Sequence, residues 1–189
     1  MPHPDAVRWN RRYQQEGLQR INRPPNPLLR KFQPLLIGGG LALDTACGLA
    51  TNGRFLAGLG WRVIGLDISL VALELSCQAA HAQQLPFSAA VMDLSDPWLP
   101  DNHFDLLMNF RFLERKALPT YRSALKPGGL LFFETFLQSR ATPTSHPEFY
   151  LQPGELQAAF ATFEVLSSGT RTTGGHRLDW LVARKPTAG

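Results

Sequence analysis

Apolar and polar positions alternate in blocks along the chain. Short apolar runs are bounded by small or polar residues, and between them lie segments with apolar positions at helical spacing. The runs predict buried strands and the spaced segments predict helices. Strands are expected near residues 41–46, 62–68, 87–93, 104–111 and 129–136, and helices near 52–59, 69–84 and 113–125. Such alternation favours crossover connections and a mainly parallel sheet.

The pattern changes near the C-terminus. A loop at 137–152 precedes a helix expected to start at Pro153, because proline suits the first helical turn. Two further apolar runs, 162–172 and 176–185, are separated only by a short glycine link. So short a link predicts a hairpin, and one of its strands must then run antiparallel to the sheet. The expected fold is α/β, a Rossmann-like three-layer sandwich with a mostly parallel seven-stranded sheet and an antiparallel C-terminal hairpin strand.

The N-terminal region is predicted to be a helical arm. Residues 1–20 have helical spacing, with a break expected at Gly17. The following segment, 22–27, contains three prolines, which fix the backbone and remove donors, so it predicts a rigid connector. A short helix is expected at 28–36. The length of 189 residues suits a single domain, 1–189, with an arm at 1–36 and a body at 37–189.

Charge is distributed unevenly along the chain. The first 34 residues hold seven basic and two acidic side chains, whereas the rest holds 12 basic and 13 acidic ones. The first 34 residues therefore carry a net charge of +5 and the rest −1, which together give the net charge of +4. A basic arm can bind nucleic acid or an anionic substrate, and it can equally be a solvated surface.

Composition excludes several classes of protein. No apolar run approaches the length of about 20 residues that spans a bilayer, and the N-terminus has no apolar signal core. We therefore expect a cytoplasmic protein. The two cysteines form no disulfide framework, and the five histidines lack the paired spacing of metal ligands, so no metal site is expected.

The most informative segment joins the first two expected strands. Asp44 ends the first apolar run and Asp67 ends the second, with the small residues Ala46, Gly48 and Ala50 in the turn between. A nucleoside-type ligand needs a turn without bulky side chains and, about 20 residues later, a carboxylate for the ribose hydroxyls. Both are present. The turn lacks the G-x-G-x-x-G pattern of dinucleotide-binding proteins.

The string LALDTACGLATNGRFLAGLGWRVIGLDIS resembles class I S-adenosylmethionine-dependent methyltransferases, especially small bacterial members related to tellurite-resistance and thiopurine methyltransferases. The blocks W-x-x-R-Y at 9–13 and LKPGGLLFFETF at 125–136 also resemble that family. Two positions depart from its pattern. Ala50 stands where glycine is common, and Thr45 replaces an apolar residue. Alanine adds a methyl group and disfavours positive φ.

The resemblance implies S-adenosylmethionine as cofactor, S-adenosylhomocysteine as product, and specific contact residues. It implies that Asp67 holds the ribose, and Asp67 is otherwise a cap for the next helix. Asp93 is implied beside the adenine, or else caps a turn. Arg12 is implied at the methionine carboxylate, or lies in water. The residues expected at the cofactor are Asp44, Ala46, Cys47, Gly48, Asn52, Asp67, Ile68, Asp93, Leu94, Asn109 and Arg12.

Catalytic residues are less clearly indicated. The catalytic candidates are Glu134 and Arg111, at the ends of the fifth and fourth strands, and Glu134 is otherwise a structural acceptor. Methyl transfer depends mainly on alignment of the reactants, so a dedicated base is optional. For the substrate we expect an anionic or neutral small molecule. Its expected contacts are Arg111 and Arg140, with an apolar wall of Phe110, Phe136 and Phe149.

The resulting hypothesis is methyl transfer from S-adenosylmethionine to a small-molecule acceptor. One alternative is an RNA methyltransferase that uses the basic arm, although the segment NFRF differs from the N-P-P-Y type of sequence in exocyclic-amine methylases. A second is a catalytically silent protein that binds S-adenosylmethionine. A nicotinamide-dependent oxidoreductase is a third.

Overall fold

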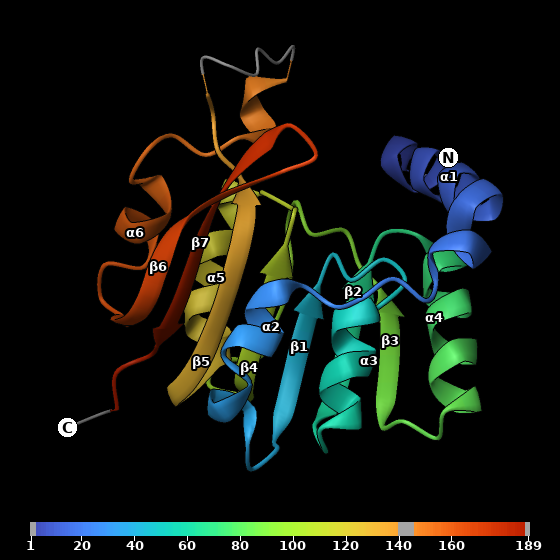
Figure 1. The fold of residues 1–189 in the computed structure, drawn as a ribbon, viewed down its shortest axis with the longest axis horizontal. Helices are drawn as coiled ribbons and strands as arrows, with labels where there is room; N and C mark the ends of the chain where they lie inside the picture. Colours follow the sequence, from blue (N-terminus) through green and yellow to red (C-terminus); the bar gives the residue numbers. More distant parts are fainter. Residues whose placement is uncertain (1–2, 140–145, 188–189) are drawn as a thin grey trace. The chain divides into compact units, whose positions relative to one another are not determined.

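The computed structural model describes residues 3–139 and 146–187 (Figure 1). The chain divides into two compact units, Met1–Leu94 and Ser95–Gly189, and each is described by itself. Arg140, one of the expected substrate contacts, lies outside the described residues.

Three parallel strands form the centre of the first unit, in the order β3-β2-β1. These are β1 (Leu41–Thr45), β2 (Arg62–Asp67) and β3 (Phe87–Val91). Leu43 is opposite Ile64, and Asp67 is opposite Val91. Helices α3 (Thr51–Gly58) and α4 (Leu70–Ala82) connect these strands and pack along them (Figure 1). Each helix starts after the carboxyl end of one strand and leads to the amino end of the next, which is the crossover connection that the alternating pattern predicts.

The arm contains α1 (Pro4–Arg20), α2 (Pro27–Lys31) and the 3₁₀ helix η1 (Gln33–Leu36). The break expected at Gly17 is wrong, because α1 continues through it to Arg20. Gly17 is the one buried residue within α1. A Cβ there would approach Leu75 Cδ1 to 2.6 Å. The glycine thus allows α1 to pack closely against α4.

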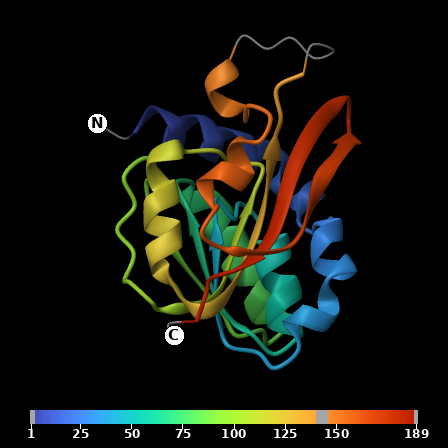
Figure 2. The same ribbon diagram turned by 90° about the vertical axis from the view of Figure 1, so that its left-hand side faces the viewer.

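The second unit has the strand order β4-β5-β7-β6. Its strands are β4 (Phe104–Phe110), β5 (Leu125–Phe136), β6 (Glu164–Thr173) and β7 (His176–Arg184). β4 and β5 are parallel, whereas β7 is antiparallel to both β5 and β6. The expected C-terminal hairpin is confirmed, and Figure 2 shows it as a long two-stranded ribbon. The helical elements are η2 (Arg115–Ala117), α5 (Leu118–Ala124), η3 (Pro147–Phe149) and α6 (Glu155–Ala159).

The expected fold class is confirmed, with seven strands in one mixed sheet and helices between them. β5 begins four residues before its expected start, because Leu125 already pairs with Phe104 of β4. The last helix begins at Glu155 rather than at Pro153, after Gly154 in a left-handed conformation. Within the described residues, no helix combines the length and apolar character needed to cross a membrane.

Candidate functional site

Two buried carboxylates end the first two parallel strands. Asp44 is opposite Gly65 in the β1–β2 register, and Asp67 is the last residue of β2. Their exposed fractions are 1% and 7%. In open α/β sheets, ligands bind at the carboxyl ends of parallel strands. Both acids therefore lie at the edge where a ligand is expected.

The turn after β1 has an unusual backbone. Ala46, Gly48 and Ala50 all have positive φ, of 50°, 52° and 48°. The structure thus places two alanines in the conformation that alanine disfavours, at a cost of about 1–2 kcal/mol each. Backbone bonds support this shape, since the amide of Cys47 donates to the carbonyl of Leu66 at 3.0 Å.

Asp67 is bound to the turn itself. Its Oδ2 accepts the amide of Gly48 at 2.8 Å, and its Oδ1 accepts the amide of Ser69 at 2.9 Å. Burial raises the pKa of Asp67, while these backbone bonds oppose the shift. The cap of α4 is Ser69, whose Oγ accepts the amide of Ala72. Asp67 therefore connects the end of β2 to the turn after β1.

Asp44 supports the start of α3. Its Oδ2 accepts the amide of Gly53 at 3.0 Å. A Cβ at Gly53 would lie 3.0 Å from the same oxygen, so a small residue is required there. Burial is the main cause that raises the pKa of Asp44 to about 7.

Helix α1 contacts the turn through Tyr13. A Cβ at Gly48 would clash with the Tyr13 hydroxyl, which therefore lies directly against the glycine. Burial raises the pKa of Tyr13, and the nearby Asp67 adds to the rise. The Trp9 ring stacks on Tyr13 at a centroid distance of 5.9 Å. The sequence marked Tyr13 only as part of a motif, and its contact with Gly48 depends on how α1 packs.

Asn10 is a second arm residue that the sequence did not indicate. Its Oδ1 accepts the Ser69 hydroxyl at 2.8 Å and the amide of Val71 at 3.2 Å. It thus caps α4 from another helix. Nothing in the local sequence distinguishes it from a surface asparagine.

The remaining expected cofactor residues of the first unit differ in their partners and in their burial. The Arg12 guanidinium lies over the Trp9 ring at 5.2 Å and 3.5 Å from Glu16, so its described partners are on α1 itself. Asn52 accepts the amide of Asn26. Asp93 lies 3.6 Å from His3 Nε2. Cys47 and Ile68 are half-buried and Leu94 is buried.

The other three predicted residues belong to the second unit. Asn109 is buried, and its Nδ2 donates to the carbonyl of Phe112 at 2.7 Å. Arg111 has a positive φ of 61°, and its amide donates to the carbonyl of Glu134. The Glu134 carboxylate is fully buried and accepts two bonds from Arg171, at 2.6 and 2.8 Å. The pair holds the Glu134 carboxylate against Arg171 of β6, away from solvent.

Aromatic side chains gather at the end of β5. Phe136 lies 5.5 Å from the Tyr150 ring and 5.3 Å from the His176 ring. The Tyr150 hydroxyl is 3.4 Å from His176 Nδ1. Phe149, expected in an apolar wall, is 47% exposed.

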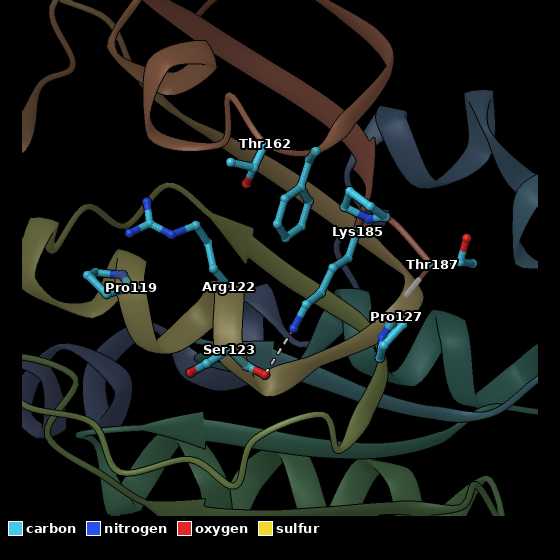
Figure 3. A pocket seen from close by; sticks show the side chains of 9 residues that line it. Pro119, Arg122, Ser123, Pro127, Thr162, Lys185 and Thr187 are labelled. Carbon is cyan, nitrogen blue, oxygen red and sulfur yellow. Dashed lines mark hydrogen bonds between the residues drawn. The ribbon is translucent and has the colours of Figure 1, made fainter. Parts of the chain in front are cut away.

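Figure 3 shows a cavity of about 580 Å³ near the start of β5 and the end of β7. Pro127 and Phe163 contribute apolar surface to it. The Lys185 ammonium group donates to three oxygens, those of Asn102, Ser123 and Leu125. The cavity lies at the end of β5 remote from Glu134, so it is separate from the expected acceptor site. No group of three or more potential metal ligands occurs in the parts that the structure describes.

Comparison with known proteins agrees with this geometry. Residues 42–129 match the family described as a methyltransferase domain. A ubiquinone biosynthesis O-methyltransferase of Coxiella burnetii is 28% identical over 134 residues. That match covers 67% of this chain and 56% of the relative, so the chain spans little more than half the length of this relative.

Two solved structures show the same fold. One is described as SAM-dependent methyltransferases from Methanosarcina mazei, with a TM-score of 0.72 and 20% identity, over 88% of this chain and 100% of that one. The other is phosphoethanolamine N-methyltransferase 2 of Haemonchus contortus in complex with S-adenosyl-L-methionine. Its TM-score is 0.72 at 16% identity, over 85% of this chain and 52% of that one. Residues 42–129 thus match a methyltransferase domain, and the chain shares the fold of a solved S-adenosylmethionine-dependent methyltransferase.

Proposed function

We propose that the chain transfers a methyl group from S-adenosylmethionine to a small-molecule acceptor. One observation carries the proposal: Asp67, at the carboxyl end of β2, is bonded to the amide of Gly48 in the turn after β1. This bond places a carboxylate beside a turn of small residues with left-handed backbone. That combination suits a nucleoside. Its ribose hydroxyls require hydrogen-bond acceptors, and the atoms next to the ribose require a backbone without bulky side chains.

The residues of the turn fit such a cofactor. Asp67 accepts one amide on each oxygen, and an ionised carboxylate has about four acceptor sites, so capacity remains for ribose hydroxyls. Asp93 is half exposed, which suits contact with the adenine amine. The Tyr13 hydroxyl lies against Gly48, so α1 would have to adjust for a ligand that contacts this glycine.

S-adenosylmethionine supplies a methyl group already activated by the positive charge of its sulfur. The protein then has to bind both reactants, align them and exclude water. Because the Glu134 carboxylate is held in two bonds by Arg171, we assign it a positioning role and assign no general base.

The acceptor atom is proposed to be a hydroxyl oxygen. The support is the named activity of the Coxiella relative, an O-methyltransferase. The aromatic group of Phe136, Tyr150 and His176 at the end of β5 offers apolar surface, which is typical of small-molecule sites.

Calorimetric titration tests the cofactor. S-adenosylmethionine and S-adenosylhomocysteine should bind, and a nicotinamide dinucleotide should not. Asp67→Ala should weaken binding of both at least about tenfold, because hydrogen bonds to a charged acceptor contribute about 1.5–3 kcal/mol each. The matched control is Asp96→Asn, at an exposed loop acid. Unchanged affinity in a folded Asp67→Ala protein would remove the basis of the proposal.

RNA methylation is a second candidate because Arg8, Arg11 and Arg12 are exposed on α1. A protein that neutralises six or more phosphates loses about 10³-fold or more in affinity between 50 and 200 mM salt. Tight and steeply salt-dependent binding to transfer or ribosomal RNA would favour this candidate. Binding of S-adenosylmethionine without methyl transfer to any phenol, carboxylate or RNA tested would instead favour a catalytically silent protein.

A further inference from the structure

A polar cavity of about 240 Å³ lies between the connector after α1 and helix α3. The connector crosses α3 (Figure 1), and it is bonded to that helix at both of its ends. At one end Arg54 donates to the carbonyl of Ile21, and at the other Asn52 accepts the amide of Asn26. The cavity is therefore formed by two segments that are held together.

Arg54 brings a buried positive charge to this cavity. The residue is 8% exposed, and its Nε is buried with no hydrogen-bond partner among the described residues. Within those residues its guanidinium also forms no ion pair with a carboxylate. Burial lowers the pKa of Arg54, because the charged form has lost contact with water. A buried charge of this kind normally has a counter-charge.

The other side chains around the cavity also favour an anion. Arg23 lines it from the connector and has no carboxylate partner in the described part of the chain. Asn22 and Thr51 add an amide and a hydroxyl, and no acidic residue is among the described residues that line the cavity. A guanidinium presents paired N–H donors that match the oxygens of phosphate. Two such residues, one from each segment that lines the cavity, therefore form a donor set for a tetrahedral oxyanion.

The cavity extends beyond the candidate cofactor turn. Thr51, which lines it, directly follows Ala50 of that turn, and Gln83, which also lines it, follows the last residue of α4. A helix of 13 residues is about 20 Å long. Gln83 therefore lies about the length of α4 away from the carboxyl end of β2, after which α4 begins.

We propose that this cavity binds a tetrahedral oxyanion of the phosphate class, independently of the cofactor. Arg54 of α3 and Arg23 of the connector hold it from two sides. The source is either free inorganic phosphate or the phosphate group of a small phosphomonoester. Phe55 and Pro25 supply the apolar surface that would contact the organic part of an ester. Because the anion contacts both segments, its binding also stabilises the attachment of the arm to α3.

The test is titration of the full-length protein with inorganic phosphate and with phenyl phosphate, at ionic strength held constant with NaCl. Binding is followed by calorimetry and by the unfolding temperature, in the absence and in the presence of saturating S-adenosylhomocysteine. The variants are Arg54→Gln and Arg23→Gln. Arg30→Gln is the matched control, at an exposed arginine of α2. Since Arg23 is exposed, its substitution keeps the test valid if Arg54→Gln does not fold.

We expect phosphate to raise the unfolding temperature beyond NaCl alone, with or without S-adenosylhomocysteine. Arg54→Gln should weaken its affinity about tenfold or more, Arg23→Gln should weaken it measurably, and Arg30→Gln should leave it unchanged. Tighter binding of phenyl phosphate identifies the ester as the source, and tighter binding of inorganic phosphate identifies the free ion. The proposal is overturned if wild-type protein does not bind phosphate, if all three variants behave alike, or if S-adenosylhomocysteine abolishes binding.

Discussion

Replacement of Asp44 by asparagine should make the stability of the protein less dependent on pH. Asp44 is 1% exposed, and its Oδ2 accepts one backbone amide, that of Gly53. Burial raises its pKa from 3.8 to about 7, and the nearby Asp67 adds to the rise. Asparagine keeps a side-chain oxygen that accepts the same amide and carries no titrating group.

The direction follows from proton uptake. The native carboxyl binds its proton more tightly than the unfolded chain does, so folding takes up a proton between about pH 4 and pH 7. The stabilising contribution is complete below pH 3.8 and is lost as the pH rises through 7. The shift of about three pKa units corresponds to roughly 4 kcal/mol in total. About 3 kcal/mol of this falls between pH 5 and pH 8.

Urea unfolding at pH 5 and pH 8 measures the effect. From pH 5 to pH 8, the free energy of unfolding should decrease by about 3 kcal/mol less in Asp44→Asn than in the wild type. Asp67 and Asp179 also have raised pKa values, but both are present in the two proteins, so the difference reports the removal of Asp44, including its effect on Asp67. Asp96→Asn controls for the loss of one exposed acid. Parallel pH dependence in wild type and Asp44→Asn would refute this reasoning.

Three further perturbations test other contacts. Gly48→Ala should lower the free energy of unfolding by about 1–2 kcal/mol, because φ is +52° and the new Cβ meets Tyr13. Gly58→Ala, with open space, should have little effect in the same urea experiment. Arg171→Met should lower the free energy of unfolding by about 3 kcal/mol, since the buried Glu134 loses its partner. The double variant with Glu134→Gln should recover part of that free energy, and losses that simply add in the double variant would argue against the pair. Deletion of residues 1–20 should leave a folded protein with weaker affinity for S-adenosylmethionine, and equal affinity in calorimetry would show that the arm is not a lid.

Much of the fold was predictable because it depends on local pattern. The apolar runs that end in Asp44 and Asp67 gave β1 and β2 to within one residue, and the glycine link gave the hairpin. The errors have tertiary causes. Gly17 continues a helix because Leu75 of α4 packs against it, and β5 begins early because Leu125 pairs with Phe104. Neither partner is close in sequence.

In the candidate site, too, the features that depend on local sequence were predictable and those that depend on tertiary contacts were not. The sequence separation between the turn and Asp67 could be recognised in advance, because a single crossover helix of limited length connects the two consecutive parallel strands. The pairing of Glu134 with Arg171 was not, because the two lie 37 residues apart and meet only through the register of β5, β7 and β6. Figure 2 shows the hairpin that carries Arg171. A charged residue in a hairpin strand has no local signal that names its partner.

The turn after β1 is held in an unfavourable backbone conformation by interactions outside it. Ala46 and Ala50 both occupy the left-handed region, at a cost of about 1–2 kcal/mol each. Asp67 binds the amide of Gly48, and the carbonyl of Leu66 accepts the amide of Cys47. Both supports come from the end of β2, so the strand that presents the carboxylate also fixes the turn opposite it. A backbone fixed before a ligand arrives loses less conformational entropy when the ligand binds. The cost of the two alanines is then offset by the same contacts that fix the turn at which we propose that the nucleoside binds.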